Sequence, residues 1–102
     1  MLEILNEAQF ENEVLNSKGV VLVDFNADWC GPCRMFKPIL EAFGKMHSEV
    51  KVVSVNVDKN DELASKNGVS GLPLVVAFRD GKEIAREVGV QSEKKLMKMV
   101  GI

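Results

Sequence analysis

The feature that most constrains the fold is a long amphipathic segment with a valine-rich run on each side. Residues 20–23 are an unbroken apolar run and residues 50–57 are rich in valine, as is typical of buried strands. Between them, apolar residues recur every three or four positions, at Met35, Phe36, Ile39, Leu40, Phe43 and Met46. This spacing predicts an amphipathic helix. Strand, helix and strand then form a parallel βαβ unit with a right-handed crossover.

The rest of the chain adds further strands and helices. Strand patterns occupy residues 2–5, 74–78 and 83–88, and the last two flank an Asp-Gly pair that is typical of a tight antiparallel hairpin. Helix patterns follow the candidate N-caps Asn6 and Ser92 and cover residues 61–66. We therefore predict an α/β fold, with a mixed sheet that is parallel at its centre and antiparallel at one edge, and with helices on both faces.

Composition and charge narrow the possible functions. The chain has 102 residues, of which 46% are hydrophobic and 27% are charged, so we expect residues 1–102 to form one domain. The formal net charge is −2 and both signs are scattered along the chain. The sequence therefore offers no basic face for a nucleic acid or a membrane surface.

The N-terminal segment and the cysteines indicate the cellular compartment in which the protein works. The first seven residues carry acidic side chains where a signal peptide has lysine or arginine. No apolar run is long enough to cross a bilayer. We therefore expect a cytoplasmic protein. Thiols are kept reduced in the cytoplasm, so a close cysteine pair there is redox-active or metal-binding more often than structural.

The two cysteines lie in the segment Trp29-Cys30-Gly31-Pro32-Cys33, between the first buried strand and the long helix. Open α/β sheets place their reactive groups at this edge. The N–H groups and the dipole of a helix N-terminus favour a thiolate, so we expect Cys30 to ionise more readily than a free cysteine. Cys33 lies one helical turn further, within the separation that a disulfide tolerates. Gly31 permits the turn, and Pro32 is preorganised for the start of a helix.

This cysteine pair is suited to thiol–disulfide exchange. Cys30, which is nearer the loop, is the expected nucleophile and forms a mixed disulfide with the substrate. Cys33, which is deeper in the helix, is expected to attack the Cys30 sulfur and release the reduced substrate. Asp24 closes the apolar run, so burial should raise the pKa of its carboxyl and suit it as a proton relay for Cys33. The alternative is that Asp24 is a structural acid whose hydrogen bonds are satisfied by its neighbours.

Other interpretations of the cysteine pair remain open from the residues alone. A pair of core thiols is one, although the Trp-x-Gly-Pro context is not typical of packing. A zinc site needs two further ligands, and the chain offers only His47, which we expect on the exposed end of the long helix. A 2Fe–2S cluster shared between two chains fits the spacing, whereas Pro32 and Trp29 favour a closed disulfide. We expect no metal and no bound cofactor.

Several motifs together resemble the thioredoxin family over the whole chain. They are Val23-Asp24-Phe25, the loop from Ala27 to Cys33, Pro38 inside the long helix, and Gly71-Leu72-Pro73, which resembles the family's loop with a cis-proline. The resemblance implies the thioredoxin fold and a small protein-disulfide reductase that is recharged by a thioredoxin reductase. It also implies that Cys30 is the nucleophile, Cys33 the resolving thiol and Asp24 the buried acid.

The resemblance further implies an apolar rim against which substrate chains lie. Its residues are Trp29, Gly71, Leu72, Pro73, Val88 and Gly89, and Gly31, Pro32 and Pro73 shape the site. Trp29 beside a reactive loop suits substrate contact, and packing alone is an equally good explanation of this residue.

Three positions depart from the common pattern of the family. Asn26 stands where many members carry an aromatic residue, which puts the packing beneath the active-site loop in question. Ser54 stands where many carry a lysine near the buried acid, so we predict a stronger upward shift in the pKa of Asp24. Leu74 replaces a threonine after Pro73 and is expected to make the rim more apolar.

The residues and the resemblance together predict a reductase that acts on disulfide-containing client proteins as a monomer. One alternative is a redox-dependent binding module without turnover. Another is a disulfide oxidant or isomerase, since the reduction potential relative to the compartment sets the direction of exchange.

Overall fold

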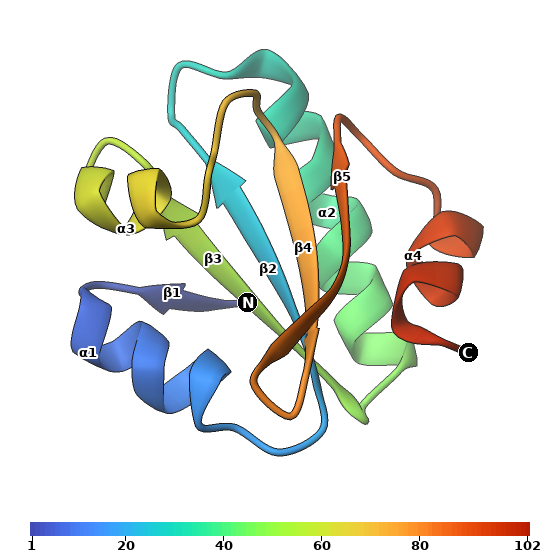
Figure 1. Ribbon diagram of the computed structural model, residues 1–102. Helices are drawn as coiled ribbons and strands as arrows, with labels where there is room; N and C mark the ends of the chain where they lie inside the picture. The colour runs from blue at the N-terminus through green and yellow to red at the C-terminus, as the bar shows by residue number, and fades with distance from the viewer.

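A five-stranded sheet runs through the computed structural model, which describes residues 1–102 (Figure 1). Its strands are β1 (Leu2–Ile4), β2 (Val20–Asn26), β3 (Val50–Asn56), β4 (Leu74–Arg79) and β5 (Lys82–Val88). They lie in the order β1-β3-β2-β4-β5. Both β1 and β2 pair with β3 in parallel, whereas β4 pairs antiparallel with β2 and with β5. The predicted mixed sheet is therefore confirmed.

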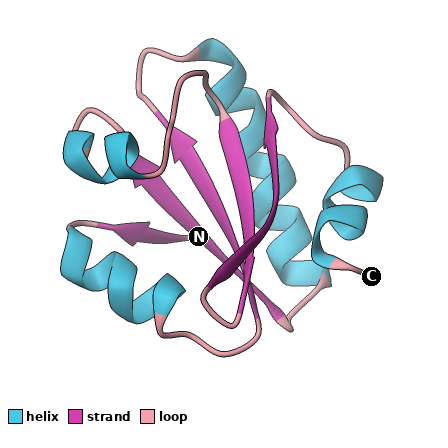
Figure 2. Cartoon of the chain, in the orientation of Figure 1, coloured by secondary structure: helices cyan, strands magenta, loops and turns pink.

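Helices cover both faces of this sheet (Figure 2). On one face lie α1 (Glu7–Phe10), its π-helical continuation η1 (Glu11–Leu15), and α3 (Asp61–Lys66). On the other face lie α2 (Gly31–Met46) and α4 (Glu93–Val100). None of the helices combines the length and apolar character that a membrane span requires.

β2 forms the centre of the sheet, and its side chains alternate between two apolar cores. Val21, Val23 and Phe25 pack on the face of α1 and α3, whereas Val20 and Leu22 pack on the face of α2 and α4. This alternation follows from the two-residue repeat of a strand. The predicted strand with both faces buried is confirmed.

The sheet face that α2 covers becomes polar toward the carboxyl ends of β2 and β3. Leu22 on β2 and Val52 on β3 belong to the apolar core. The next side chains on that face, two and four positions further along, are polar: Asp24, Asn26, Ser54 and Asn56. Together with the first two turns of α2, these side chains line one cavity. The fold thus places a cluster of four polar side chains beside the end of α2 that carries the cysteines.

Short-range signals in the sequence are realised as expected. The Asn6 side chain accepts a hydrogen bond from the Gln9 backbone at 2.8 Å, and Ser92 accepts one from the Lys95 backbone at 3.1 Å. Asp80 and Gly81 both have positive φ angles, 51° and 81°, in the turn between β4 and β5. A side chain at Gly81 would overlap the Leu15 carbonyl, so this turn requires glycine. The predicted hairpin is confirmed.

The long helix α2 continues for 16 residues through Pro38. Two positions that its spacing assigned to the apolar side are exposed, because they lie at the edges of the buried stripe: Met35 is 68% and Met46 is 66% accessible. Beyond the helix end, the prediction of a solvated His47 is wrong. Its ring packs against Phe43 at 4.4 Å between centroids, and only 17% of the side chain is exposed.

Candidate active site

The two cysteines occupy the start of α2 and form a disulfide with each other. Cys30 is the N-cap residue, with an extended backbone, and its Sγ accepts a hydrogen bond from the Cys33 N–H at 3.2 Å. The Cα atoms of the pair are 5.3 Å apart, so one turn of helix holds both sulfurs within bonding reach. An N–H group of the helix N-terminus is thus aimed at the Cys30 sulfur, the arrangement that favours a thiolate when the bond is open.

Burial does not separate the two cysteines, contrary to the expectation that Cys33 lies deeper. Their exposed fractions are 5% for Cys30 and 4% for Cys33. They differ in the cavity that each one borders. Cys30 lines an apolar groove on one side of the disulfide, and Cys33 lines a polar chamber on the other side.

The apolar groove has a volume of about 470 Å³. It is lined by Trp29, Cys30, Gly31, Pro32, Val57, Ala64, Val69, Ser70, Gly71 and Leu72. Trp29 is 70% exposed, so its indole does not serve as core packing. The indole Nε1 donates a hydrogen bond to Asp58 at 2.9 Å, which orients the ring at the border of the groove. No sequence pattern pointed to Asp58, because its partner lies 29 positions away.

The remaining rim residues lie beside this groove. The peptide bond between Leu72 and Pro73 is cis, as the resemblance implies. The Gly89 N–H donates to the Pro73 carbonyl at 2.7 Å, and a Cβ on Gly71 would lie 3.2 Å from the Val88 side chain. The structure therefore brings the rim positions of three loops together.

Leu74 does not belong to the rim, which corrects the expectation drawn from its place after Pro73. The residue is 2% exposed and packs in the core with β2 residues and α1. As the first residue of β4, it points into the sheet face that α1 and α3 cover. Val57 and Val69 line the groove in addition to the predicted positions, and no local sequence pattern distinguishes them from core valines.

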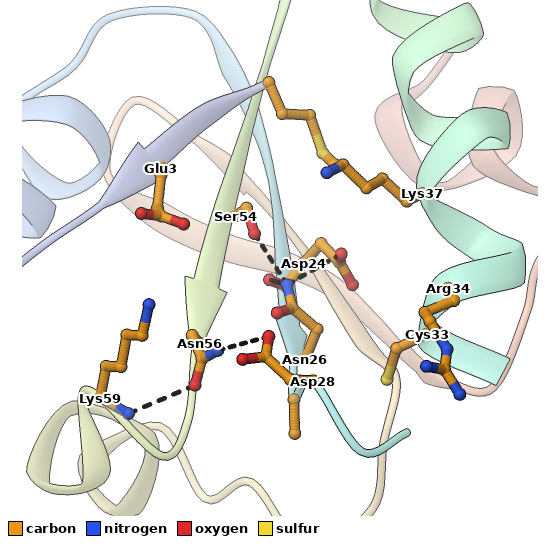
Figure 3. Close-up of a pocket in the computed structure, with 12 residues that line it drawn as sticks. Glu3, Asp24, Asn26, Asp28, Cys33, Arg34, Lys37, Ser54, Asn56 and Lys59 are labelled. Atoms are coloured by element: carbon orange, nitrogen blue, oxygen red, sulfur yellow. Dashed lines mark hydrogen bonds between the residues drawn. The ribbon is translucent and has the colours of Figure 1, made fainter. Parts of the chain in front are cut away.

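The polar chamber, of about 320 Å³, lies between β2, β3 and α2 (Figure 3). Asp24 and Cys33 both line it, so the structure brings the predicted acid and the predicted resolving cysteine to one cavity. Charged side chains also border the chamber, namely Glu3, Asp28, Arg34, Lys37 and Lys59. In Figure 3 the Asp24 carboxyl points from β2 toward α2, the helix that carries Cys33.

Asp24 is a buried and incompletely satisfied carboxyl. It is 1% exposed, and burial raises its pKa from the usual 3.8 to about 6, while a hydrogen bond from Asn26 partly offsets this rise. Oδ2 accepts that bond at 3.1 Å, whereas Oδ1 has no partner. Asn26 thus satisfies one of the two carboxyl oxygens, and the upward direction of the shift in the pKa of Asp24 is as predicted.

Asn26 and Ser54, the two unusual positions, contact each other directly. The Asn26 Nδ2 group donates to Ser54 Oγ at 2.8 Å and to Asp24 Oδ2 at 3.1 Å. The consequence of having Asn26 in place of an aromatic residue is therefore a hydrogen bond to the buried acid, and not a change in packing beneath the active-site loop. No sequence pattern links the two positions, since they are 28 residues apart and only the parallel pairing of β2 with β3 makes them neighbours.

Comparisons with known proteins agree with this geometry. A family model described as Thioredoxin matches residues 1–101. A thioredoxin of Rickettsia bellii is 41% identical over 101 residues, which cover 98% of this chain and 96% of that protein. A thioredoxin of Chlamydia trachomatis is 35% identical over 100 residues, with the same two shares covered. The chain belongs to the thioredoxin family.

Solved thioredoxins share the fold as well. The structure of Fasciola hepatica thioredoxin is similar with a TM-score of 0.87 at 38% identity, covering 99% of this chain and 97% of that one. Thioredoxins are thiol–disulfide oxidoreductases, and this chain carries their Cys-x-x-Cys disulfide at the start of α2. The protein is accordingly a protein-disulfide reductase that acts by dithiol–disulfide exchange.

Cys30 and Cys33 are joined in a disulfide and the chain has no free cysteine, which excludes the interpretation as a pair of free core thiols. A zinc ion would need further ligands near these sulfurs. The structure contains no group of three or more His, Cys, Asp or Glu side chains arranged to hold a metal ion.

Proposed function

We propose that Cys30 is the nucleophile of this thioredoxin, Cys33 the resolving thiol and Asp24 the proton relay. The observation that carries this assignment is the division of the site by its own disulfide. The Cys30 sulfur borders the apolar groove, where a substrate chain can lie, and the Cys33 sulfur borders the chamber that contains Asp24. Each sulfur therefore has the surroundings that its proposed role requires.

The reaction then proceeds in two exchanges. The Cys30 thiolate attacks one sulfur of a substrate disulfide, a mixed disulfide forms, and the other substrate sulfur leaves as a thiolate. Next, the Cys33 thiol transfers its proton to the Asp24 carboxylate, and its sulfur bonds to the Cys30 sulfur. The bond between Cys30 and the substrate breaks at the same time, which releases the second substrate thiolate. Two electrons have then passed from the cysteine pair to the substrate.

The pKa of Asp24 suits the second exchange. Near pH 7, a carboxyl with a pKa of about 6 is mostly ionised, yet it holds a proton far better than an ordinary aspartate does. The unpartnered Oδ1 is the acceptor in this proposal, because Oδ2 is already bonded to Asn26. Direct transfer and transfer through one water in the chamber both serve this role.

The apolar groove is the proposed docking site for the substrate chain. Trp29, Gly71, Leu72, Pro73, Val88 and Gly89 form its rim, and Gly31, Pro32 and Pro73 shape the site around the cysteines. The 70% exposure of Trp29 and the 59% exposure of Val88 leave apolar area that a client chain can bury.

We also propose the partners of this protein and its location. Disulfide-containing client proteins are the substrates, and a thioredoxin reductase returns the cysteine pair to the reduced state, as is general for the family. We place the protein in the cytoplasm as a monomer, with residues 1–102 acting as one thioredoxin domain. No cofactor takes part, since both electrons are carried by the two sulfurs.

Trapping of substrates tests the assigned roles. Cys33→Ser should form the mixed disulfide and fail to resolve it, so client proteins stay bound under non-reducing conditions and are released by a reductant. The matched control is the double variant Cys30→Ser, Cys33→Ser, which should trap nothing. Equal capture by both variants would contradict exchange chemistry and favour a binding module without turnover.

A further inference from the structure

Asn26 makes the only hydrogen bond to the Asp24 side chain. Its Nδ2 group donates to Asp24 Oδ2 at 3.1 Å, to the Asp24 carbonyl at 3.1 Å and to Ser54 Oγ at 2.8 Å. Three acceptors thus surround one amide nitrogen, and they come from two adjacent strands. The amide is held in a single orientation, with one of its N–H groups toward the carboxyl (Figure 3).

No cationic side chain pairs with the Asp24 carboxyl. Titratable groups face the chamber from β1, from α2, from the loops after β2 and β3, and from the N-terminus: Met1, Glu3, Asp28, Arg34, Lys37 and Lys59. None of them forms an ion pair with Asp24, and the ion pairs of the protein join other residues. The buried carboxyl therefore depends on a neutral amide for its only stabilising contact.

We propose that Asn26 is a positioning residue for the proton transfer, held by Ser54 so that it binds one carboxyl oxygen of Asp24 and leaves the other free to exchange a proton with Cys33. This inference rests on the role proposed for Asp24 above. The Asn26–Ser54 pair thus presents the dipole of a neutral amide to the Asp24 carboxyl, and not a positive charge. Because both residues are neutral, the pair itself does not titrate over the working range of the enzyme.

The pair acts on Asp24 in two ways. Its hydrogen bond favours the charged carboxylate and so lowers a pKa that burial raises. It also fixes the plane of the carboxyl, since Oδ2 is bonded while Oδ1 has no partner. Ser54 has no bond of its own to the Asp24 carboxyl, so it acts on Asp24 through Asn26.

A double-mutant cycle tests this arrangement. Asn26→Leu keeps the approximate volume and removes the donor, so the midpoint for ionisation of Asp24 should rise by about one pH unit. Ser54→Ala removes the group that orients Asn26, and about half that rise is expected. In the double variant, the rise should equal that of Asn26→Leu alone, because Ser54 has nothing left to act through. The measurement is the carboxyl ¹³C shift of Asp24 against pH in the reduced protein.

Lys37→Gln is the matched control, since it removes a charge at the chamber and leaves the Asn26–Ser54 pair untouched. Its shift should be small compared with that of Asn26→Leu. The acid side of the pH profile for resolution of the mixed disulfide should move with the Asp24 midpoint in each variant, which a merely structural role would not produce.

Three results would overturn the inference: an unmoved midpoint in Asn26→Leu, additive shifts in the double variant, or a larger shift from Lys37→Gln. If Asn26→Leu does not fold, Ser54→Ala alone tests the inference. Ser54 is only partly buried, so this variant should fold. An unmoved Asp24 midpoint in Ser54→Ala would also contradict the proposed role of the Asn26–Ser54 pair. Asp24→Asn separates this inference from the one on which it rests. Unchanged turnover in that variant removes Asp24 from the mechanism, whereas the titrations test the Asn26–Ser54 pair independently.

Discussion

The groove beside Cys30 and the chamber beside Cys33 differ in nearly every physical property, although a single disulfide separates them. The groove is apolar, and loops form it around Trp29, Gly71 and Leu72. The chamber is polar, and the ends of β2 and β3 form it together with α2. One cavity is suited to contact with another chain, and the other to holding and moving a proton.

Under the proposed roles, the difference between the two cavities explains how one helical turn serves both exchange steps. Docking of a client requires exposed apolar area that is buried on contact. Proton transfer requires a carboxyl with a raised pKa. Burial of Asp24 raises its pKa because it destabilises the charged form. On the proposed assignment, a client docked at the groove leaves the chamber unobstructed, so the second exchange can proceed while the mixed disulfide is still in place.

The largest expected effect concerns the two thiols themselves. In the reduced protein at pH 7, Cys30 should react with iodoacetamide about 100-fold faster than Cys33, because the helix N-terminus stabilises its thiolate and the groove admits the reagent. Mass spectrometry of the singly alkylated protein measures the ratio. Equal rates, or a slower Cys30, would remove the distinction between the two cavities.

Replacement of Asp24 tests the chamber. The folded-state pKa of about 6 lies above the usual 3.8, so the stability that this group contributes is fully present below pH 3.8 and is lost as the pH rises through 6. Asp24→Asn should therefore be more stable than the natural protein by about 3 kcal/mol at pH 8, with little difference near pH 4. Turnover should fall about tenfold, since water can replace the relay only in part.

Urea unfolding of the oxidised forms at both pH values checks the stability of Asp24→Asn, and a coupled disulfide-reduction assay checks its turnover. Parallel pH dependences for the two proteins would show that Asp24 is not the group responsible.

Two exposed aliphatic residues on β5 test the groove. Val88→Asp places a charge beside Gly71 at the rim, and kcat/KM for a protein disulfide should fall about fivefold. Ile84→Asp makes the same change on the same strand away from the groove, so its kcat/KM should not change. A small aromatic disulfide that does not span the rim should be reduced equally by both variants. Equal losses in the two variants would place substrate docking elsewhere.

The smallest effect is expected at the border of the groove. Asp58→Ala removes the acceptor of the indole N–H, so Trp29 should become more mobile, and kcat/KM for protein disulfides should fall about twofold. Trp29 is the only tryptophan, so fluorescence anisotropy reports its motion directly. Glu62→Gln is the charge control from the neighbouring helix α3, and an equal change in that variant would refute a specific role for Asp58.

Local features of this chain could be predicted from its sequence because each depends on neighbours along the chain. The apolar runs, the three-to-four-residue spacing of α2, the caps at Asn6 and Ser92 and the Asp80-Gly81 turn all express backbone preferences within a few residues. The cysteine pair belongs to this class too, since a single helical turn sets its separation. The exposure of Met35 was not predictable in this way, because the packing of α2 on the sheet sets the edge of the buried stripe, and the π-helical end of the first helix has no signal in the sequence.

The sequence by itself determined that a strand, a reactive turn and a helix follow one another, and it placed an acid at the end of that strand. Only the tertiary structure decided that Asn26 and Ser54 meet over this acid, that Leu74 faces the core, and that Asp58 holds the indole of Trp29. The physical reason is that strand pairing and loop placement bring together residues from distant parts of the chain. Their hydrogen bonds stabilise particular side-chain orientations only once the sheet has formed.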